Sequence, residues 1–189
     1  GWSIALLDAV TPQESGRFTD GGGVVQRAPV EPLTNYFVGR VRRELRAGNT
    51  VVGGLFTAVD RHLSDSTLTG ALRSDAYLGG LDLNHSWDNR SWALDASVAA
   101  TTIRGSASSI ALAQRSSARY YQRPDATSIA FDPTRTTLGG HAEQLAVSKV
   151  SGLHWGGNIA LQDKSPGYET NDAGLTQTVN RLSLSTDIH

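Results

Sequence analysis

Apolar and polar residues alternate along most of this chain in stretches that are typical of β-strands. Between Tyr77 and Trp87 every second position is mostly apolar, while the positions between them are mostly small or polar. After a polar break the same alternation resumes at Trp92 and continues to Ala100. A period of two residues over this length predicts strands rather than helices.

The connections between these stretches alternate between short and long. Short polar breaks fall at residues 46–49, 87–90 and 150–152, and long Gly-, Pro- and Ser-rich segments fall at 11–34, 61–75, 104–140 and 164–177. Antiparallel strands with short turns at one rim and long loops at the other are typical of membrane β-barrels. The sequence therefore predicts an all-β fold, an antiparallel up-and-down transmembrane β-barrel of about eight strands with a short helix in one long loop.

The chain opens at Gly1 without an initiator Met, and it stops inside an alternating stretch that includes Arg181 and Ser185. Eight strands would make about the smallest closed barrel. We therefore interpret residues 1–189 as a single β-barrel region, an arc of a larger barrel and a fragment of a longer chain.

The break after Trp87 allows two registers. A two-residue turn would set Asp82 opposite Asp95, and two adjacent carboxylates repel each other. A four-residue loop would instead pair Trp87 with Trp92 and Asn84 with Asp95. We favour the second register because it pairs the aromatic rings and separates the carboxylates.

Aromatic residues gather beside the short breaks. In a membrane barrel Trp87 and Trp92 would lie in the girdle at the membrane–water interface. A three-residue loop at 150–152 would set Val147 opposite Trp155, again with an aromatic ring beside a short turn.

The apolar side of these strands has two interpretations. In a membrane barrel it contacts lipid, whereas in a soluble all-β glycan-binding module it would be covered by a second sheet. The soluble alternative predicts that Leu81, Leu94 and Ile159 are buried against one another. Residues 2–10 and 51–59 are apolar on both sides, so the pattern does not orient them.

The polar side of the strands supplies candidate pore-lining residues. Charged and amide side chains there could form a wall that biases which solutes pass. Alternatively, they only cross-pair, as in the polar interior of any water-filled barrel. The candidate residues are Arg40, Arg42, Glu44, Asp82, Asn84, Asp95, Asn158 and Gln162.

The connection 104–140 is too long for an ordinary loop. Residues 108–117 predict a short helix with a Ser cap. A cluster of aromatic and cationic side chains follows, at Arg119, Tyr120, Tyr121 and Arg123. This loop could fold into the pore as a constriction or stack Tyr rings on sugars, or it could cap the barrel, with Tyr and Arg holding it to the rim.

Composition excludes several classes of protein. The formal net charge of -1 argues against a nucleic-acid binder, and the absence of Cys excludes disulfides. No run of about eighteen apolar residues predicts a membrane-spanning helix. The five His residues lack metal-binding spacing, and the glycines at 21–23 lack a P-loop Lys. We therefore name no catalytic, cofactor-binding or metal-binding residue.

Four segments carry a resemblance to a known family. They are Asn-Tyr-Phe-Val-Gly-Arg-Val-Arg-Arg at 35–43, Arg-Ser-Ser-Ala-Arg-Tyr-Tyr-Gln-Arg-Pro-Asp at 115–125, Asp-Pro-Thr-Arg-Thr at 132–136 and Ser-Pro-Gly-Tyr-Glu-Thr-Asn-Asp at 165–172. The chain resembles large bacterial outer-membrane proteins of unknown function, in which a family-nine-type carbohydrate-binding module precedes a long β-barrel region. Only the barrel part is matched, and no catalytic residue carries over.

Pattern and resemblance together lead to one expected function. We expect a protein of the bacterial outer membrane that contacts the lipid bilayer and acts as a channel or surface protein for hydrophilic solutes, saccharides among them. It would need no cofactor and bind no nucleic acid, and no enzymatic activity is expected from this segment. A glycan-processing surface protein, with a carboxyl pair in a loop cleft, is the alternative.

Overall fold

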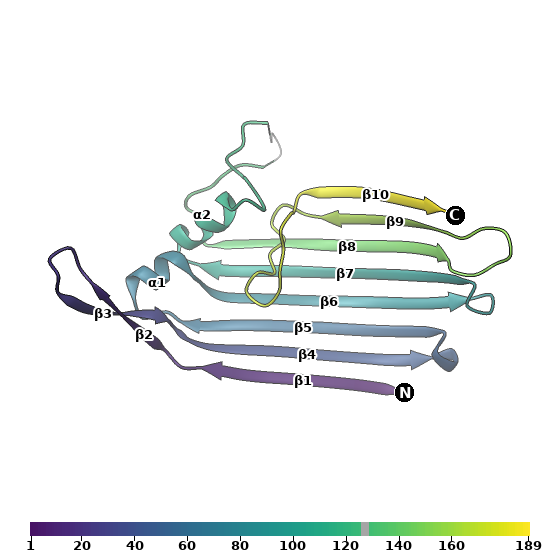
Figure 1. The fold of residues 1–189 in the computed structure, drawn as a ribbon, viewed down its shortest axis with the longest axis horizontal. Coiled ribbons are helices and arrows are strands. Elements are labelled where there is room, and N and C mark those ends of the chain that lie inside the picture. The colour runs from purple at the N-terminus through teal and green to yellow at the C-terminus, as the bar shows by residue number, and fades with distance from the viewer. Residues whose placement is uncertain (126–128) are drawn as a thin grey trace.

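The computed structural model describes residues 1–125 and 129–189 of the chain. Residues 126–128, which belong to the long loop predicted at 104–140, lie outside the described residues. The fold is dominated by one antiparallel sheet whose strands lie side by side in chain order (Figure 1). From one edge to the other its strands are β1 (Trp2–Thr11), β4 (Leu33–Leu45), β5 (Thr50–His62), β6 (Arg73–Trp87), β7 (Trp92–Gly105), β8 (Thr137–Lys149), β9 (Gly157–Lys164) and β10 (Arg181–Ile188).

A one-turn 3-10 helix, η1 (Arg46–Gly48), forms the short turn between β4 and β5. The other elements lie in the long connections, all at the opposite end of the sheet (Figure 1). They are the hairpin of β2 (Glu14–Thr19) and β3 (Val25–Glu31), the helix α1 (Ser66–Ala71) and the helix α2 (Ala107–Arg115). The helix in the long loop is confirmed, and Ser106 caps it by accepting a hydrogen bond from Ser109 N at 3.1 Å. The hairpin and α1 were not expected. No described helix is long and apolar enough to cross a membrane.

The all-β, antiparallel class is confirmed, and eight strands form the main sheet. No closed barrel is found among the described residues, because β1 and β10 form the two edges of the sheet and do not pair with each other. The chain termini lie at the short-turn end, one beside each edge (Figure 1).

The register at the short turn between β6 and β7 is the one favoured from the sequence. Trp87 pairs with Trp92, and Asn84 pairs with Asp95. The prediction for the next turn is wrong, because Val147 pairs with Ile159 and residues 150–156 form a longer connection. This longer loop lets Trp155 pack edge-on against Trp92, with ring centroids 5.8 Å apart.

The register divides the side chains of the sheet into two sets, because residues paired across antiparallel strands point to the same face. The open face carries Trp2, Ile4, Leu6, Val41, Phe56, Leu81, Leu94, Val98, Leu145 and Ile159. The covered face carries Tyr36, Arg40, Val59, Ala76, Asp82, Ile103 and Leu138.

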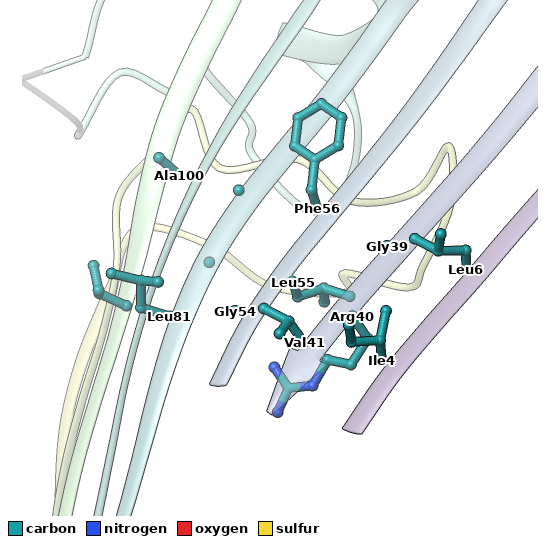
Figure 2. Close-up of a pocket in the computed structure, with 13 residues that line it drawn as sticks. Ile4, Leu6, Gly39, Arg40, Val41, Gly54, Leu55, Phe56, Leu81 and Ala100 are labelled. Atoms are coloured by element: carbon teal, nitrogen blue, oxygen red, sulfur yellow. The ribbon is translucent and has the colours of Figure 1, made fainter. Parts of the chain in front are cut away.

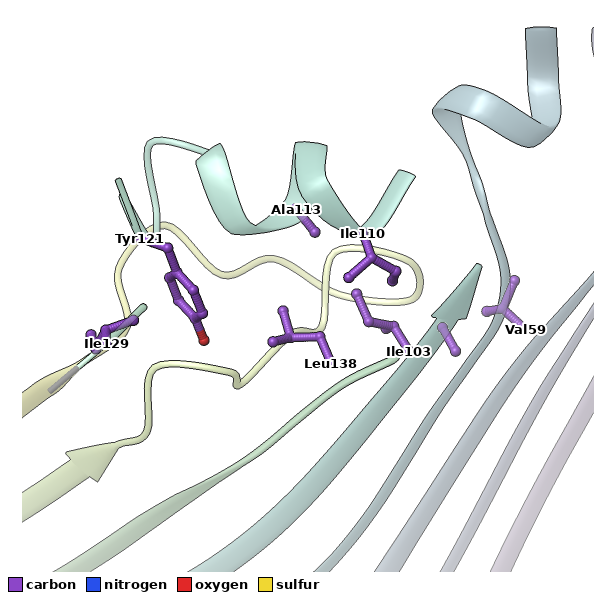
Figure 3. Close-up of a cluster of buried hydrophobic side chains, with 8 residues drawn as sticks. Val59, Ile103, Ile110, Ala113, Tyr121, Ile129 and Leu138 are labelled. Atoms are coloured by element: carbon purple, nitrogen blue, oxygen red, sulfur yellow. The ribbon is translucent and has the colours of Figure 1, made fainter. Parts of the chain in front are cut away.

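The hydrophobic core lies at the long-loop end of the covered face (Figure 3). There α2 places Ile110 and Ala113 over the strand residues Val59, Ile103 and Leu138. Tyr121 and Ile129, from the segment after α2, complete the cluster. Only one end of one face is therefore packed in the manner of a globular protein.

The open face is not covered by any element of the described chain. Leu81 is 66% exposed and Ile159 is 50% exposed, and large apolar side chains continue to both edges. Within residues 1–125 and 129–189, no second sheet packs over Leu81, Leu94 and Ile159 as the soluble alternative predicted. An uncovered apolar face of this extent is typical of a surface that contacts a partner or a membrane.

Candidate functional site

All eight predicted wall residues lie on the covered face. The strand registers place them there together, although they come from four different strands, β4, β6, β7 and β9. They are Arg40, Arg42, Glu44, Asp82, Asn84, Asp95, Asn158 and Gln162.

Arg40 and Asp82 form an ion pair that spans the intervening strand β5. Arg40 Nη2 donates to Asp82 Oδ1 at 2.9 Å, and a second bond joins Nη1 to Oδ2. Gly53 lies between them, since a Cβ added there would be 2.6 Å from Asp82 Oδ2. The sequence pattern missed this pair because the partners are separated by a whole strand.

The amide residues of the wall also pair across strands. Asn84 donates to the carboxylate of Asp95, directly opposite on β7. Asn158 Nδ2 donates to Ser148 Oγ at 2.6 Å. Gln162 Nε2 lies 3.4 Å from Gln144 Oε1. Six of the eight wall residues therefore form cross-strand polar pairs, in which Ser148 and Gln144 were not anticipated. Arg42 and Glu44 lie on the same face and form no such pair within the described part of the chain.

The aromatic and cationic cluster divides into buried and exposed members. Arg119 is buried and forms an ion pair with Glu169, with Nη1 2.8 Å from Oε2 and the two side chains 1% and 3% exposed. It also donates to the main-chain oxygen of Tyr168. Tyr121 is buried in the core, whereas the ring of Tyr120 is exposed. Arg119 and Tyr121 thus hold the loop in place.

The cation of Arg123 lies farther from this core. Its Nε is 3.8 Å from Asp125 Oδ1, and Asp125 is exposed to water. This contact is a surface ion pair, which contributes little to stability.

Asp172 anchors the long loop between β9 and β10, residues 165–180, to the sheet. Its Oδ1 is 2.7 Å from Arg61 Nη1, and its Oδ2 is 3.0 Å from Arg73 Nη2. Asp172 is almost fully buried, and the arginines come from the loop ends of β5 and β6. The sequence could not indicate this cluster because its partners are 111 and 99 residues away.

The same loop lies directly on β7 and β8. Glu169 N donates to Thr101 Oγ1 at 3.0 Å, in a buried position. A Cβ added to Gly140 would lie 2.5 Å from Gly167 C and closer still to Tyr168 N. The covered face therefore needs a residue without a side chain at Gly140 to seat the loop.

Two tyrosines of the loop assembly have shifted acidities. Burial raises the pKa of Tyr121, and the nearby cations of Arg119 and Arg135 lower it by less. Burial also raises the pKa of Tyr168. Both rings consequently favour the neutral form in the assembled loops.

The four tryptophans of the chain all lie at the short-turn end of the sheet, three of them in one contact series. The rings of Trp87 and Trp92 stack with centroids 6.0 Å apart and planes 12° from parallel. Trp155 then packs against Trp92, and Lys149 Nζ lies 4.3 Å from the centre of the Trp155 ring. At the β1 edge the guanidinium of Arg43 lies 4.9 Å from the centre of the Trp2 ring.

The loop carboxylates are already engaged by arginines. Glu169 is paired with Arg119, and Asp172 with Arg61 and Arg73. Among the described residues no group of three or more His, Cys, Asp or Glu is arranged to hold a metal ion. No protein family, curated protein or solved structure compared with this chain matches it.

Proposed function

We propose that this chain is an arc of a β-barrel in the bacterial outer membrane, with lipid against the open face and water against the covered face. The barrel handles hydrophilic solutes, saccharides among them, without covalent catalysis. The observation that carries the proposal is the slope of the tryptophan row across the sheet.

The tryptophans shift by one residue for each strand crossed. Trp2 of β1 aligns through four strand pairs with Ala96 of β7, and Trp92 lies four residues closer to the short turns. Two strands further on, in β9, Gly157 aligns with Trp92. Trp155 comes two residues before Gly157 and so lies two residues closer to the short turns. Figure 1 shows the short-turn end stepping outward in the same direction.

This slope equals the strand tilt of a membrane barrel. One residue is about 3.3 Å along a strand and one strand about 4.8 Å across, so the row runs about 35° from the perpendicular to the strands. Strands of outer-membrane barrels tilt by about 35–45°. The tryptophans would therefore lie at one depth in a membrane, as an interfacial girdle does.

Acidic residues toward the two edges of the open face shift in the same sense, while Asp60 and Asp75 between them lie farther toward the long loops. Asp8 of β1 aligns with Gly139 of β8, while Glu143 lies four residues closer to the turns, five strands away. In register alone, Glu143 would stand in the middle of the apolar side chains. When the tilt of the strands is taken into account, Glu143 and its cross-strand partner Asp163 lie at the boundary of the apolar band nearest the long loops. Asp8 lies at the same depth.

The distance between the two boundaries suits a bilayer. Trp87 and Tyr77 stand ten residues apart on the open face of β6. That is about 33 Å along the strand and about 27 Å after a 35° tilt. The apolar band of outer-membrane barrels is about 25 Å tall.

The covered face supports a lumen wider than that of an eight-stranded barrel. Side chains alone fill a barrel of about eight strands. Here α2 and the loop that carries Asp172 also lie on this face. Both edge strands, β1 and β10, need further strands, because unpaired backbone is not tolerated in lipid.

The wall composition favours neutral hydrophilic solutes. Beyond the loops, the covered face presents the amides Asn84, Asn158 and Gln162. Its charges are of both signs, Arg40 and Arg42 against Glu44, Asp82 and Asp95, so neither sign dominates the wall. Amide and hydroxyl groups exchange hydrogen bonds with polyhydroxylated molecules without imposing a charge requirement. Saccharides are the solute class that this wall suits.

Substitution of a mid-band residue tests the membrane contact. Leu81→Arg should prevent assembly into the outer membrane, because a cation at the midplane costs about 2–4 kcal/mol. Leu153→Arg is the matched control, since Leu153 is 96% exposed in the loop between β8 and β9, beyond the tryptophan row. The measurement is the fraction of protein recovered in washed outer membranes.

Equal recovery of the two variants would contradict the proposal. The channel role is tested separately by conductance of the assembled wild-type protein in planar bilayers. Discrete current steps that added oligosaccharides reduce are expected. A membrane-assembled protein that conducts no ions would leave the lipid contact in place and remove the channel.

A further inference from the structure

The open face has a groove that crosses its strands (Figure 2). The groove has a volume of about 660 Å³ and runs from Ile4 on β1 to Ala100 on β7. Residues that pair with one another across successive strands form a row that runs across the sheet. Two adjacent rows on the open face line the groove, one through Gly54 and the other through Gly39 and Gly79. Its depth comes from these glycines, which stand among large apolar side chains.

The groove has the width of a hydrocarbon chain. Two register rows on one face are about 7 Å apart, and five strands span about 19 Å across the sheet. An α-helix with its side chains is about 10–12 Å in diameter and is too wide to enter. A Cβ added to Gly79 would meet nothing within 4 Å, so the space above it is open.

A cation stands beside the groove, near its β1 end and on its short-turn side. Arg43 follows the lining residue Val41 by two positions on the same face of β4, about 7 Å along the strand. Its guanidinium lies over the Trp2 ring, and no carboxylate of the described chain lies within 4.0 Å of it. A guanidinium has five N–H donors in a fork that suits a phosphate.

We propose that the groove and Arg43 together bind one anionic phospholipid. An acyl chain lies in the groove, and the headgroup phosphate is held by Arg43 at the level of the tryptophan row. This site rests on the proposed function, because it requires the open face to meet lipid.

Lys149 provides an internal comparison. It also lies over a tryptophan ring at the short-turn end of the open face, but its Nζ donates to the main-chain oxygen of Trp155 at 3.0 Å. The groove does not extend to Lys149. A cation near the membrane surface without an adjoining groove should not retain a lipid.

Native mass spectrometry of the full chain, assembled in outer membranes and extracted in detergent, tests the site. The probe is an equimolar mixture of phosphatidylglycerol and phosphatidylcholine. Wild-type protein should retain phosphatidylglycerol about tenfold better, because the choline cation of phosphatidylcholine already compensates its phosphate; tenfold is the size of one charge-assisted hydrogen bond. Arg43→Gln should abolish this preference, and Arg43→Lys should restore part of it. Gly79→Leu should reduce retention of both lipids by filling the groove.

Two variants serve as matched controls. Lys149→Gln removes the other cation, and Thr186→Leu adds an equally large side chain to β10, away from the groove. Both should retain phosphatidylglycerol as the wild type does. Assembled protein that shows no lipid preference, or that loses it equally with Lys149→Gln, would overturn the lipid site and leave the membrane proposal standing. Failure of the wild type to assemble in membranes would overturn both.

Discussion

Arg119 and Glu169 form a buried ion pair between two loops that are separated by 49 intervening residues, with Nη1 and Oε2 2.8 Å apart. Arg119 belongs to the segment after α2, and Glu169 to the loop between β9 and β10. Their contact joins the segment between α2 and β8 and the loop between β9 and β10 into one assembly over the covered face.

Removal of the acidic partner should release this assembly. Glu169→Gln leaves the Arg119 cation uncompensated, and breaking a buried pair costs about 3–5 kcal/mol. We expect faster amide hydrogen exchange in residues 165–180, while the central strands exchange at the wild-type rate.

A double substitution separates the ion pair from general packing. Replacing Arg119 by Met and Glu169 by Leu together removes both charges, so slow exchange should return in large part. Asp125→Asn, at the surface pair with Arg123, should change nothing. Fast exchange in the double variant would mean that packing, not charge, holds the loops.

Gly140, which lies beneath the loop between β9 and β10, should tolerate no side chain. Gly140→Ala places a Cβ 2.5 Å from Gly167 C and closer to Tyr168 N, and these backbone atoms cannot move aside as a flexible side chain can. We expect the loop to leave β8 and limited proteolysis to cut within 165–180.

Gly79→Ala is the matched control, since it adds the same methyl group to a strand glycine with open space above it. Its proteolysis should equal that of the wild type. If Gly140→Ala is equally resistant, the loop does not lie on β8 as described.

The adjacent glycines Gly53 and Gly54 of β5 should also differ in how they tolerate a side chain. A Cβ at Gly53 would lie 2.6 Å from Asp82 Oδ2 and 2.7 Å from Arg40 Nη2, while one at Gly54 would lie 3.5 Å from Val41 on the opposite face. Both contacts are the ends of flexible side chains that can move aside, so Gly53→Ala should separate the Arg40–Asp82 pair and destabilise the protein by about 1 kcal/mol or less, as expected for a partly exposed ion pair. Gly54→Ala should be nearly neutral, and denaturant unfolding of both variants measures the difference.

Alkaline pH should loosen the loop assembly. Burial raises the pKa of Tyr121 above its ordinary value of about 10, so the folded form disfavours the phenolate. The stabilisation is complete below pH of about 10 and is lost as the pH rises through the higher folded-state pKa. Absorbance of the tyrosinate and proteolysis of the loops should change together.

Tyr121→Phe removes the ionisable group and keeps the ring. This variant should lose part of the alkaline transition, the remainder belonging to Tyr168, whose pKa burial also raises. An unchanged transition in Tyr121→Phe would assign the alkaline effect to other groups.

The local pattern of the sequence was sufficient for the strands and their sides. A period of two residues places Arg40, Asp82 and Asn158 on the polar side of their own strands, and strand pairing then brings them to one face. The aromatic and carboxylate residues around the short turn between β6 and β7 also determined its register, because paired rings and separated charges favour one alignment. The resemblance to outer-membrane proteins remains a prediction.

Only the tertiary structure decided what the long connections do and how the girdle runs. Loops have no periodicity, so nothing local indicates that Asp172 reaches Arg61 and Arg73 or that Gly140 must seat the loop between β9 and β10. The slope from Trp2 to Trp155 depends on the register of every strand pair between them. The register predicted for the β8–β9 turn was wrong, and that one error would have hidden the slope. Alternation acts within a strand, whereas these relationships arise between segments that the chain brings together only when it folds.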